Sequence, residues 1–409
     1  MVSIHQPAPA IFDRCDRLLL LSKGHVAYSG PTCEVAPYFG TLEVPIPTNV
    51  SVADFVIDFV NTDFIRGANE EMLQLDYAQQ SWRGSEAKEQ TDREMAEVVE
   101  EMLNGQKVVT GQQRDTSVMV KLSIMTVLIC RSLLKSRRDI VVFGIRFVMY
   151  IGLALMMGTV WLRLTPTQEN IQAFINAIFF GGAFMSFMAV AYIPAYLEDH
   201  RRFCIERADG LYGPATFQIA NIVVAIPFLA AIATCFSAVA YWLMNFRPDF
   251  GAFMTWTFWL FLDLVAAESL VVLISSMVPI FVVALAATAF ANGLWMCTGG
   301  FLVPTASLNP FWRYLFHYID YQSYVFRGMM INEFGHRKFS CAPAEDGANC
   351  RCMYDSQFAG QCMIDGNAVL EGYGLSAHTS SALTSSAIVI AIIIGFRLLC
   401  GLLLFWRRP

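Results

Sequence analysis

Charged side chains are scarce in this chain of 409 residues, where they make up 15% of the sequence, against about 25% in an ordinary soluble domain. The shortage is uneven, because residues 1–139 hold 33 charged side chains and residues 140–409 hold only 29. A net charge of −6 without a basic stripe argues against nucleic acid as a partner. The first residues lack a basic segment followed by an apolar one, so we expect no cleavable signal peptide. The uneven charge excludes a single soluble globular domain.

Six apolar runs in the second part are long enough to cross a membrane, since a helix needs about 20 apolar residues to span the hydrocarbon layer. They are Ile140–Leu162, Ile171–Leu197, Thr216–Phe246, Phe250–Val278, Ile280–Val303 and Ser381–Trp406. A buried soluble core explains one or two such runs but not six, so we expect an integral multi-pass membrane protein.

Basic residues lie unequally on the two sides of these runs. One side carries most of them: Arg131, Lys135, Arg137, Arg138, Arg201, Arg202, Arg207, Arg407 and Arg408. The short loops on the other side carry only Arg163 and Arg247. Because cytosolic loops are enriched in Lys and Arg, both termini are predicted to be cytosolic and the long loop 304–380 extracellular or lumenal.

Four of the eleven cysteines fall within 22 residues of that loop: Cys341, Cys350, Cys352 and Cys362. Disulfides persist on the oxidising side of a membrane, which agrees with the predicted orientation. Four cysteines allow three pairings, and the sequence leaves the choice open. A zinc site is the weaker alternative, because the loop has no Cys-x-x-Cys and its nearest histidines are remote in sequence. We therefore expect disulfides and no metal.

The first 60 residues read as the end of a larger domain. Arg17–Leu21 and His25–Ser29 have strand character, and the turn residues Ser22–Gly24 lie between them. One or two helical turns are expected over Thr32–Phe39. So few residues do not close a hydrophobic core alone.

The next segment, residues 61–118, reads as an acidic cytosolic linker. Residues 66–115 hold 6 basic and 11 acidic side chains and few large apolar ones, which is typical of a solvated segment. One helix is predicted within it, at Glu89–Leu103.

Residues 119–139 differ from the linker. Leu122, Met125, Ile129 and Leu133 recur at helical spacing with basic residues between them. This pattern predicts an amphipathic connecting helix near the inner membrane surface, and packing against a cytosolic domain would give the same pattern.

Specific motifs occur along nearly the whole chain. The early ones are Ser3–Pro7, Ile11–Phe12, Asp16–Ser22, Gly24, Tyr28–Pro31, Tyr38–Phe39, Asn49 and Ala53–Phe55. The later ones are Glu206–Arg207, Gly210–Tyr212, Pro227, Gly299–Leu302, Pro310–Trp312, Tyr324 and Asn332–Phe334. In this order they closely resemble the G subfamily of ABC transporters, the White/pleiotropic-drug-resistance type.

The resemblance implies a mainly α fold. Residues 1–60 would be the C-terminal remnant of an α/β P-loop nucleotide-binding domain. Residues 140–409 would be a polytopic six-helix transmembrane domain of the ABC-2 type (type V exporter). The family also has a re-entrant helix that corresponds to Pro310–Phe334.

The resemblance makes His5 the switch histidine of the cassette, which contacts the ATP γ-phosphate and helps hold the attacking water. The chain has no G-x-x-x-x-G-K-[ST] phosphate loop, no signature segment and no Walker B strand. We therefore expect ATP and Mg²⁺ to bind in an intact parent protein, and this chain alone to bind neither and to hydrolyse no ATP. Truncation is the expected reason, and a natural product without a cassette is the alternative.

The resemblance also assigns residues of the membrane domain. Phe187 lies where the family has a substrate-clamping phenylalanine, and Phe301 and Leu302 match the apolar pair that plugs its central cavity. Glu206 and Arg207 belong to the short connection that would transmit cassette movement to the spans.

Asn292, Trp295 and Met296 follow one helix face below the implied plug, at positions i, i+3 and i+4. Aromatic and methionine side chains suit flat apolar substrates, so these residues are candidates for substrate binding. Ordinary helix packing gives the same pattern.

Four charged residues lie inside the predicted spans: Arg146, Asp263, Glu268 and Arg397. An intramembrane charge is costly and usually faces protein or water. Arg146 and Arg397 lie near predicted cytosolic ends, from which long side chains can reach the interface. For Glu268 an interhelical pair or polar contact is favoured over a proton or ion relay.

These features together predict half of an ATP-driven exporter of a hydrophobic or amphipathic small molecule, in the plasma membrane. A second half-transporter, the same or different, would complete the cavity, and membrane lipid and the substrate are further partners. A regulatory or dominant-negative subunit without a cassette is the first alternative. An ATP-independent channel or carrier ranks below it, because no internal symmetry is visible in the sequence.

Overall fold

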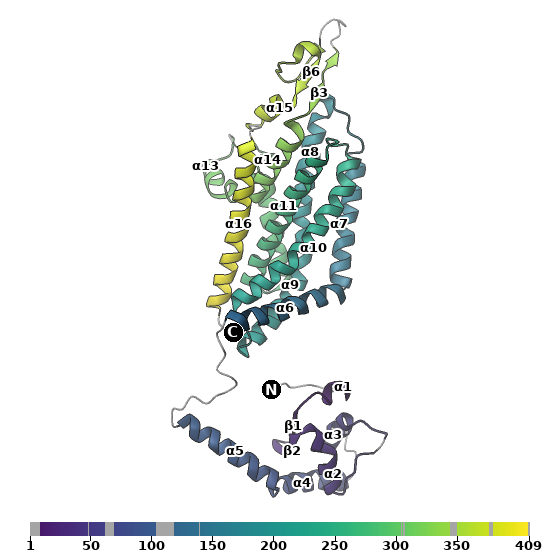
Figure 1. Cartoon of the computed structure of the whole chain (residues 1–409), viewed down its shortest axis with the longest axis vertical. Helices are drawn as coiled ribbons and strands as arrows, with labels where there is room; N and C mark the ends of the chain where they lie inside the picture. The colour runs from purple at the N-terminus through teal and green to yellow at the C-terminus, as the bar shows by residue number, and fades with distance from the viewer. Residues whose placement is uncertain are drawn as a thin grey trace. The chain divides into compact units, whose positions relative to one another are not determined.

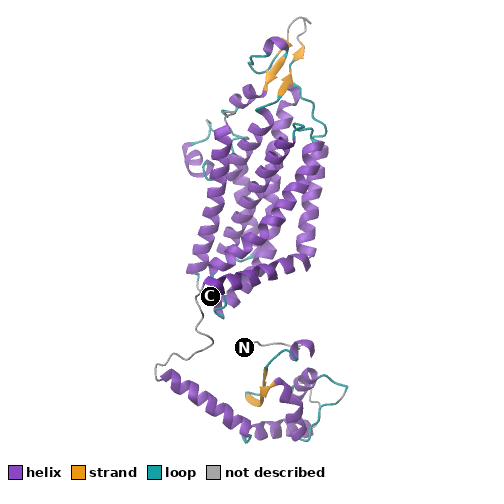
Figure 2. Cartoon of the chain, viewed as in Figure 1, coloured by secondary structure: helices purple, strands orange, loops and turns teal. Residues whose placement is uncertain are grey.

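The computed structural model describes residues 9–47, 49–61, 69–103, 118–138, 140–303, 305, 307–343, 350–375 and 379–407. The chain divides into two compact units, Met1–Asp115 and Thr116–Pro409, each with its own hydrophobic core. Helices dominate both units, and the strands are short (Figure 2). His5 lies outside the described residues.

The first unit is built around one hairpin. Its elements are α1 (Pro9–Phe12), β1 (Arg17–Ser22), β2 (His25–Pro31), η1 (Thr32–Glu34), α2 (Val35–Thr41), α3 (Val52–Val60), α4 (Asn69–Arg83) and α5 (Glu86–Leu103). β1 and β2 pair antiparallel, and Lys23 and Gly24 between them have φ values of 50° and 80°. A two-residue hairpin turn requires such values, so the predicted hairpin is confirmed.

Helix α4 belongs to the core of this unit, and here the structure differs from the solvated linker expected from residue 61. Trp82 is 4% exposed, and its ring centroid lies 5.9 Å from that of Tyr28. Gln79 donates from Nε2 to the carbonyl of Ser22 at 3.1 Å. A narrow apolar face folds this helix onto β2, although the composition of the whole segment is polar.

The second unit begins with α6 (Val118–Arg138), the predicted amphipathic helix. Six apolar helical segments follow, and they confirm the six predicted spans. Five of them are the single helices α7 (Ile140–Val160), α10 (Pro214–Leu243), α11 (Phe250–Met277), α12 (Phe281–Thr298) and α16 (Thr379–Trp406). The remaining segment is the second in chain order and combines η2 (Gln168–Asn170), α8 (Ile171–Met188), η3 (Ala189–Tyr192) and α9 (Ile193–Ala208). The long helices form an elongated bundle, and α6 crosses one end of it (Figure 1).

Helix α11 forms the centre of the bundle. In its most apolar part 78% of the residues are buried, against 22% in α16. It packs against α16, α10, α14 and α8, which surround it. Its second half is almost wholly buried, whereas Met254 and Phe258 in its first half are exposed. Asp249 caps its first turn by accepting from the Ala252 N–H at 3.0 Å.

The long loop after α12 re-enters the bundle before it leaves. It contains α13 (Pro310–Trp312), the π-helical turn η4 (Arg313–His317) and α14 (Tyr321–Phe334). The first turn of α14 contacts α8 and α12 in the interior, through Tyr321, and its last turn leads away to the end of the bundle opposite α6. This course matches the re-entrant segment that the resemblance implies.

A small module closes that opposite end, and we call residues 335–375 the disulfide module (Figure 1). Its elements are β3 (Lys338–Ser340), β4 (Ala342–Pro343), β5 (Cys350–Arg351), η5 (Ala359–Gln361), β6 (Met363–Asp365) and α15 (Gly366–Gly372). Disulfides join Cys341 to Cys352 and Cys350 to Cys362, with Cα atoms 4.9 and 5.4 Å apart. The expected disulfides are confirmed, and the structure selects one of the three pairings.

Candidate functional site

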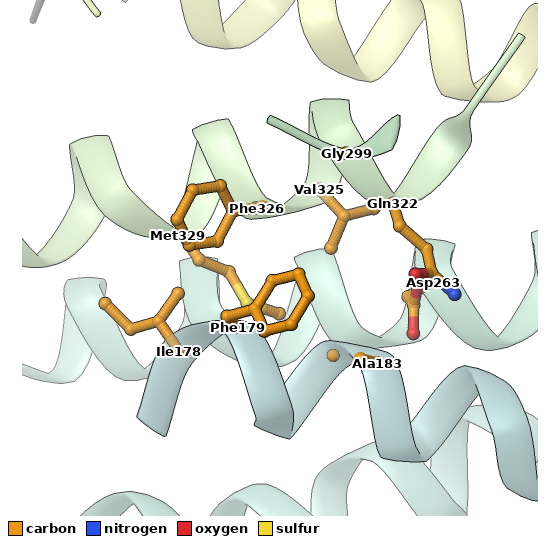
Figure 3. Close-up of a pocket in the computed structure, with 10 residues that line it drawn as sticks. Ile178, Phe179, Ala183, Asp263, Gly299, Gln322, Val325, Phe326 and Met329 are labelled. Atoms are coloured by element: carbon orange, nitrogen blue, oxygen red, sulfur yellow. The ribbon is translucent and has the colours of Figure 1, made fainter. Parts of the chain in front are cut away.

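A small pocket lies inside the bundle, between α8, α11, α14 and the end of α12. Asp263 and Gln322 lie together at one end of it, and Phe326 and Met329 lie at the other (Figure 3). Its cavity volume is about 10 Å³, which is roughly the room that a single water molecule needs. In this single chain the pocket is therefore too small for a substrate.

Three phenylalanines pack beside this pocket. The Phe301 ring stacks on Phe179 with centroids 4.1 Å apart and meets Phe326 edge-on at 5.7 Å. Phe179 and Phe326 line the pocket themselves. Such contacts are worth about 0.5–1.5 kcal/mol each beyond the buried area. We call these three rings the aromatic cluster.

The structure separates the two residues of the implied plug. Phe301 belongs to the aromatic cluster, whereas the next residue, Leu302, is 52% exposed. Phe187 is 38% exposed near the end of α8. Leu302 and Phe187 therefore offer apolar surface that this chain does not cover.

The residues expected on the substrate-binding face of α12 differ in their exposure. Asn292 and Trp295 are buried within the chain, and Met296 is only partly covered. Asn292 Oδ1 accepts from Tyr321 Oη at 3.4 Å and from Gln322 Nε2 at 3.3 Å. Because Asn292 points into the polar interior, it holds α14 in place rather than facing an open cavity.

A set of buried polar side chains runs beside the pocket. Ser186 on α8 lies 2.7 Å from Tyr321 Oη and 3.4 Å from Asp263 Oδ1. Asp320 caps α14 by accepting from the Gln322 N–H at 2.9 Å, and Thr298 donates to its other oxygen at 3.3 Å. The interior of the bundle is thus polar at one level, although its walls are apolar.

A second charged group lies nearer the α6 end of the bundle. Arg146 on α7 and Glu268 on α11 form an ion pair at 2.5 Å, and both are almost fully buried. The guanidinium also lies over the rings of Tyr192 and Phe228, at 5.0 and 5.3 Å. The prediction that Arg146 reaches the interface is therefore wrong, because Glu268 neutralises it inside the protein. For Glu268 the favoured interhelical pair is confirmed.

Arg397 on α16 also turns inward. Its Nη1 donates to Asn221 Oδ1 at 2.7 Å, and its Nε donates to Ser269 Oγ at 3.0 Å. Neutral oxygens from two neighbouring helices hold this charge, so it too does not extend to the interface.

Ion pairs tie α6 to α9 at one end of the bundle. Arg131 pairs with Glu206, and Lys135 lies 2.6 Å from Asp199. Tyr212 donates its hydroxyl to the same Glu206 carboxylate. Burial and that carboxylate raise the pKa of Tyr212 above its usual range, so the phenol keeps the proton that it donates.

Two arginines cap helices at this same end. Arg207 donates to the carbonyls of Leu404 and Phe405, the latter at 3.1 Å, in the last turn of α16. Arg407, just after that turn, donates to the carbonyl of Ser276 at 2.9 Å, in the last turn of α11. Positive charge at a helix C-terminus is favourable because the last carbonyls lack partners there.

Glu206 and Arg207 therefore have different contacts although they are adjacent in sequence. Glu206 faces α6, whereas Arg207 faces the end of α16. Together they link three helices at one end of the bundle. No group of three or more His, Cys, Asp or Glu side chains suited to a metal occurs in the part of the chain that the structure describes.

The sequence drew attention to Asp263 only as a charge inside an apolar run. It gave no sign that Tyr321, Gln322 and Ser186 would gather around this residue. Tyr321 and Gln322 lie almost 60 residues further along the chain, in a segment that is not an apolar run. A polar residue at the start of α14 was the available signal, but only the re-entrant course of that helix gives it meaning.

Two family models match this chain, and both are described as ABC-2 type transporter. One covers residues 124–334 and the other residues 5–133. The first match alone covers half of the chain. The chain therefore belongs to the ABC-2 type transporter family.

Curated relatives place it in the G subfamily of ABC transporters, as the motifs predict. ABC transporter G family member 1 of Petunia hybrida is 29% identical over 85% of this chain and 55% of its own length. Member 11 of Arabidopsis thaliana is 27% identical, over 96% of this chain and 56% of its own length. Member 13 of the same plant is 25% identical, over 99% and 62%. This chain spans about half to three-fifths of the length of these relatives.

Proposed function

We propose that this chain is one half of an ATP-driven exporter of a hydrophobic or amphipathic small molecule, such as a lipid, a sterol or a drug-like compound. The aromatic cluster carries this proposal. Phe179, Phe301 and Phe326 come from three different elements and meet beside a pocket in the bundle interior. Separating α12 from α8 and α14 would open an apolar path lined by these rings.

A second half-transporter would complete the cavity. Phe187 and Leu302 leave apolar surface uncovered, and Phe290 on α12 is 73% exposed. In a dimer these side chains would face the partner across a shared path, where Phe187 and Met296 would contact the substrate. Trp295 would support that wall from behind, since it is buried.

Energy would reach the bundle at the α6 end. Both termini and the basic residues of α6 would be cytosolic, in the plasma membrane, with the disulfide module outside. Cassettes of the intact transporter would bind ATP and Mg²⁺, and His5 would act there as the switch histidine. Movement of the cassette would pass through α6 to Glu206 and through Arg207 to α16.

Efflux from cells tests this function. The chain is produced alone and together with a G-subfamily half-transporter that carries a complete cassette, and the loss of a fluorescent amphipathic dye is followed. Efflux above that of cells producing the complete half alone is expected only in the co-expressing cells, and ATP depletion should abolish it. Dye loss from cells that produce the chain alone, or after ATP depletion, would contradict the proposal.

A matched pair of variants tests the role of the aromatic cluster. Phe301→Ala should lower efflux at least several-fold, because it removes the ring contacts with Phe179 and Phe326 beside the path. Leu398→Ala, at an exposed position on α16 away from the Arg207 contact, should leave efflux unchanged. Equal effects of the two substitutions would show that the cluster is ordinary packing.

A regulatory subunit without transport of its own is the second candidate. The uncovered apolar side chains of Phe187 and Leu302 are compatible with it, because a chain that pairs through this surface could block a complete half. The same cells distinguish the two functions, since a dominant-negative subunit would lower the dye efflux of the complete half instead of raising it.

A further inference from the structure

Two buried oxygens at the inner pocket have no donor. Asp263 Oδ2 and Gln322 Oε1 both lack a hydrogen-bond partner among the residues that the structure describes. Both side chains line the same pocket and lie next to each other in it (Figure 3). Buried acceptors without donors are rare because each one forfeits the hydrogen bonds it made in water. Something that donates is therefore expected between these two oxygens.

A bare carboxylate does not suit this position. Asp263 is fully buried near the midpoint of α11, and no ion pair of the described residues includes it. The hydrogen bond that it accepts from Ser186 is long at 3.4 Å. An unpaired charge at such depth costs several kcal/mol, and groups in that position usually take or lose a proton instead.

The neighbouring charged and titratable groups do not neutralise it. Asp320 and Tyr321 at the start of α14, and Tyr150 on α7, are close enough to interact with it electrostatically. All three side chains are neutral when protonated and negative when ionised, so none of them supplies a positive charge. The nearest arginine on α7, Arg146, is already paired with Glu268, which lies about 7 Å further along α11. Arg397 on α16 donates to Ser269, which lies on α11 one residue beyond Glu268.

We propose that Asp263 is a proton-binding site and carries its proton at neutral pH as a carboxylic acid. One O–H then satisfies both orphaned oxygens, because Asp263 Oδ2 becomes the donor and Gln322 Oε1 the acceptor. The bond runs directly or through the one water that the pocket can hold. The proposal goes beyond transport and holds whatever the chain exports.

The proton also links the site to the aromatic cluster. Phe179 and Phe326 line the same pocket, so separation of the rings would let water reach Asp263. The acid could then ionise, with its proton passing to that water as hydronium and the carboxylate remaining solvated. The closed pocket thus binds the proton, and the open pocket releases it.

Infrared difference spectroscopy tests the protonation directly. Purified protein in lipid nanodiscs at neutral pH should show the C=O stretch of a protonated carboxyl group that Asp263→Asn removes. Asp355→Asn, at an exposed position of the disulfide module, is the matched control and should leave the band unchanged. Absence of a band that depends on Asp263 would overturn the proposal.

Thermal unfolding of the same proteins distinguishes a protonated Asp263 from an ionised Asp263 that binds a metal cation or a water molecule. Asparagine mimics the neutral acid, so Asp263→Asn should change the melting temperature by less than about 2 °C at neutral pH. The folded state holds a proton that the unfolded chain lacks, so raising the pH should destabilise the unmodified protein more than this variant. A large loss at neutral pH, or stabilisation of the unmodified protein by sodium or potassium ions alone, would show an ionised Asp263 and overturn the proposal.

Discussion

The two ends of the membrane bundle are held together in different ways. At the disulfide module, two covalent links and the buried Glu333–Arg337 pair fix a short chain segment. At the α6 end, ion pairs and two arginine caps join one helix to another. Partly exposed ion pairs exchange partners at little cost, whereas disulfides do not. The difference indicates that the fold of the disulfide module is fixed within itself, whereas the contacts at the α6 end, which join one helix to another, are able to rearrange.

The largest effect is expected between the two ends, at the buried pair of Arg146 and Glu268. Glu268→Gln leaves the arginine charge buried without a counter-charge, which should cost about 3–5 kcal/mol of stability. The melting temperature of the purified protein measures this loss. Glu371→Gln, at an exposed position of α15, is the control and should have no effect.

Removing both charges sharpens the same test. Arg146→Leu combined with Glu268→Leu should cost less than either substitution alone, because no uncompensated charge remains. Losses that simply add would mean that the two side chains contribute independently, against the paired geometry.

The second effect concerns the fixed end. Cys350→Ser with Cys362→Ser opens one of the two links, and a loop of this size contributes about 3 kcal/mol. We expect the disulfide module to become sensitive to protease while the melting temperature of the bundle changes little. Cys297→Ser, at an exposed free cysteine on α12, is the control. A module that stays resistant would show that its strands hold without the disulfide.

The third effect concerns the caps at the α6 end. Arg207→Gln removes the charge that satisfies the last carbonyls of α16, which should cost about 1–2 kcal/mol. Arg201→Gln on the same helix changes an exposed arginine and should be nearly neutral. If both variants melt at the same temperature, the cap makes no net contribution and this end is held by other contacts.

The smallest effect belongs to the link between α6 and α9. A double-mutant cycle of Arg131→Ala and Glu206→Ala should give a coupling of about 0.5–1 kcal/mol, because Arg131 is partly exposed. The coupling should shrink as salt rises, since partly solvated charges are screened. A coupling free energy that is large and independent of salt would show that the α6 end does not rearrange easily, and the two ends would then not differ.

Much of the architecture follows from local sequence patterns. Apolar runs of sufficient length predict all six spans, because a helix satisfies its own backbone hydrogen bonds where the bilayer offers no water. The hairpin at Ser22–Gly24 follows from turn residues between two strand-like runs. Helix α4 was missed because its composition is polar and only one narrow face reaches the core.

The contacts that define the site follow less directly. Apolar residues at helical spacing on α12 favour a cavity wall, yet Asn292 and Trp295 are buried within the chain. Spacing places residues on one face of a helix but does not say which neighbour covers that face. The pairing of Arg146 with Glu268 is likewise hidden, because 122 residues separate the two side chains.

The sequence by itself determined the class of this protein, the number of its spans and the presence of disulfides. These properties depend on composition, run length and motif order, which are local or additive along the chain. The tertiary structure alone decided which cysteines pair, which buried charges find partners and that Asp263 and Gln322 meet without a donor. Those outcomes depend on how helices far apart in sequence pack against α11, and no local pattern encodes that arrangement.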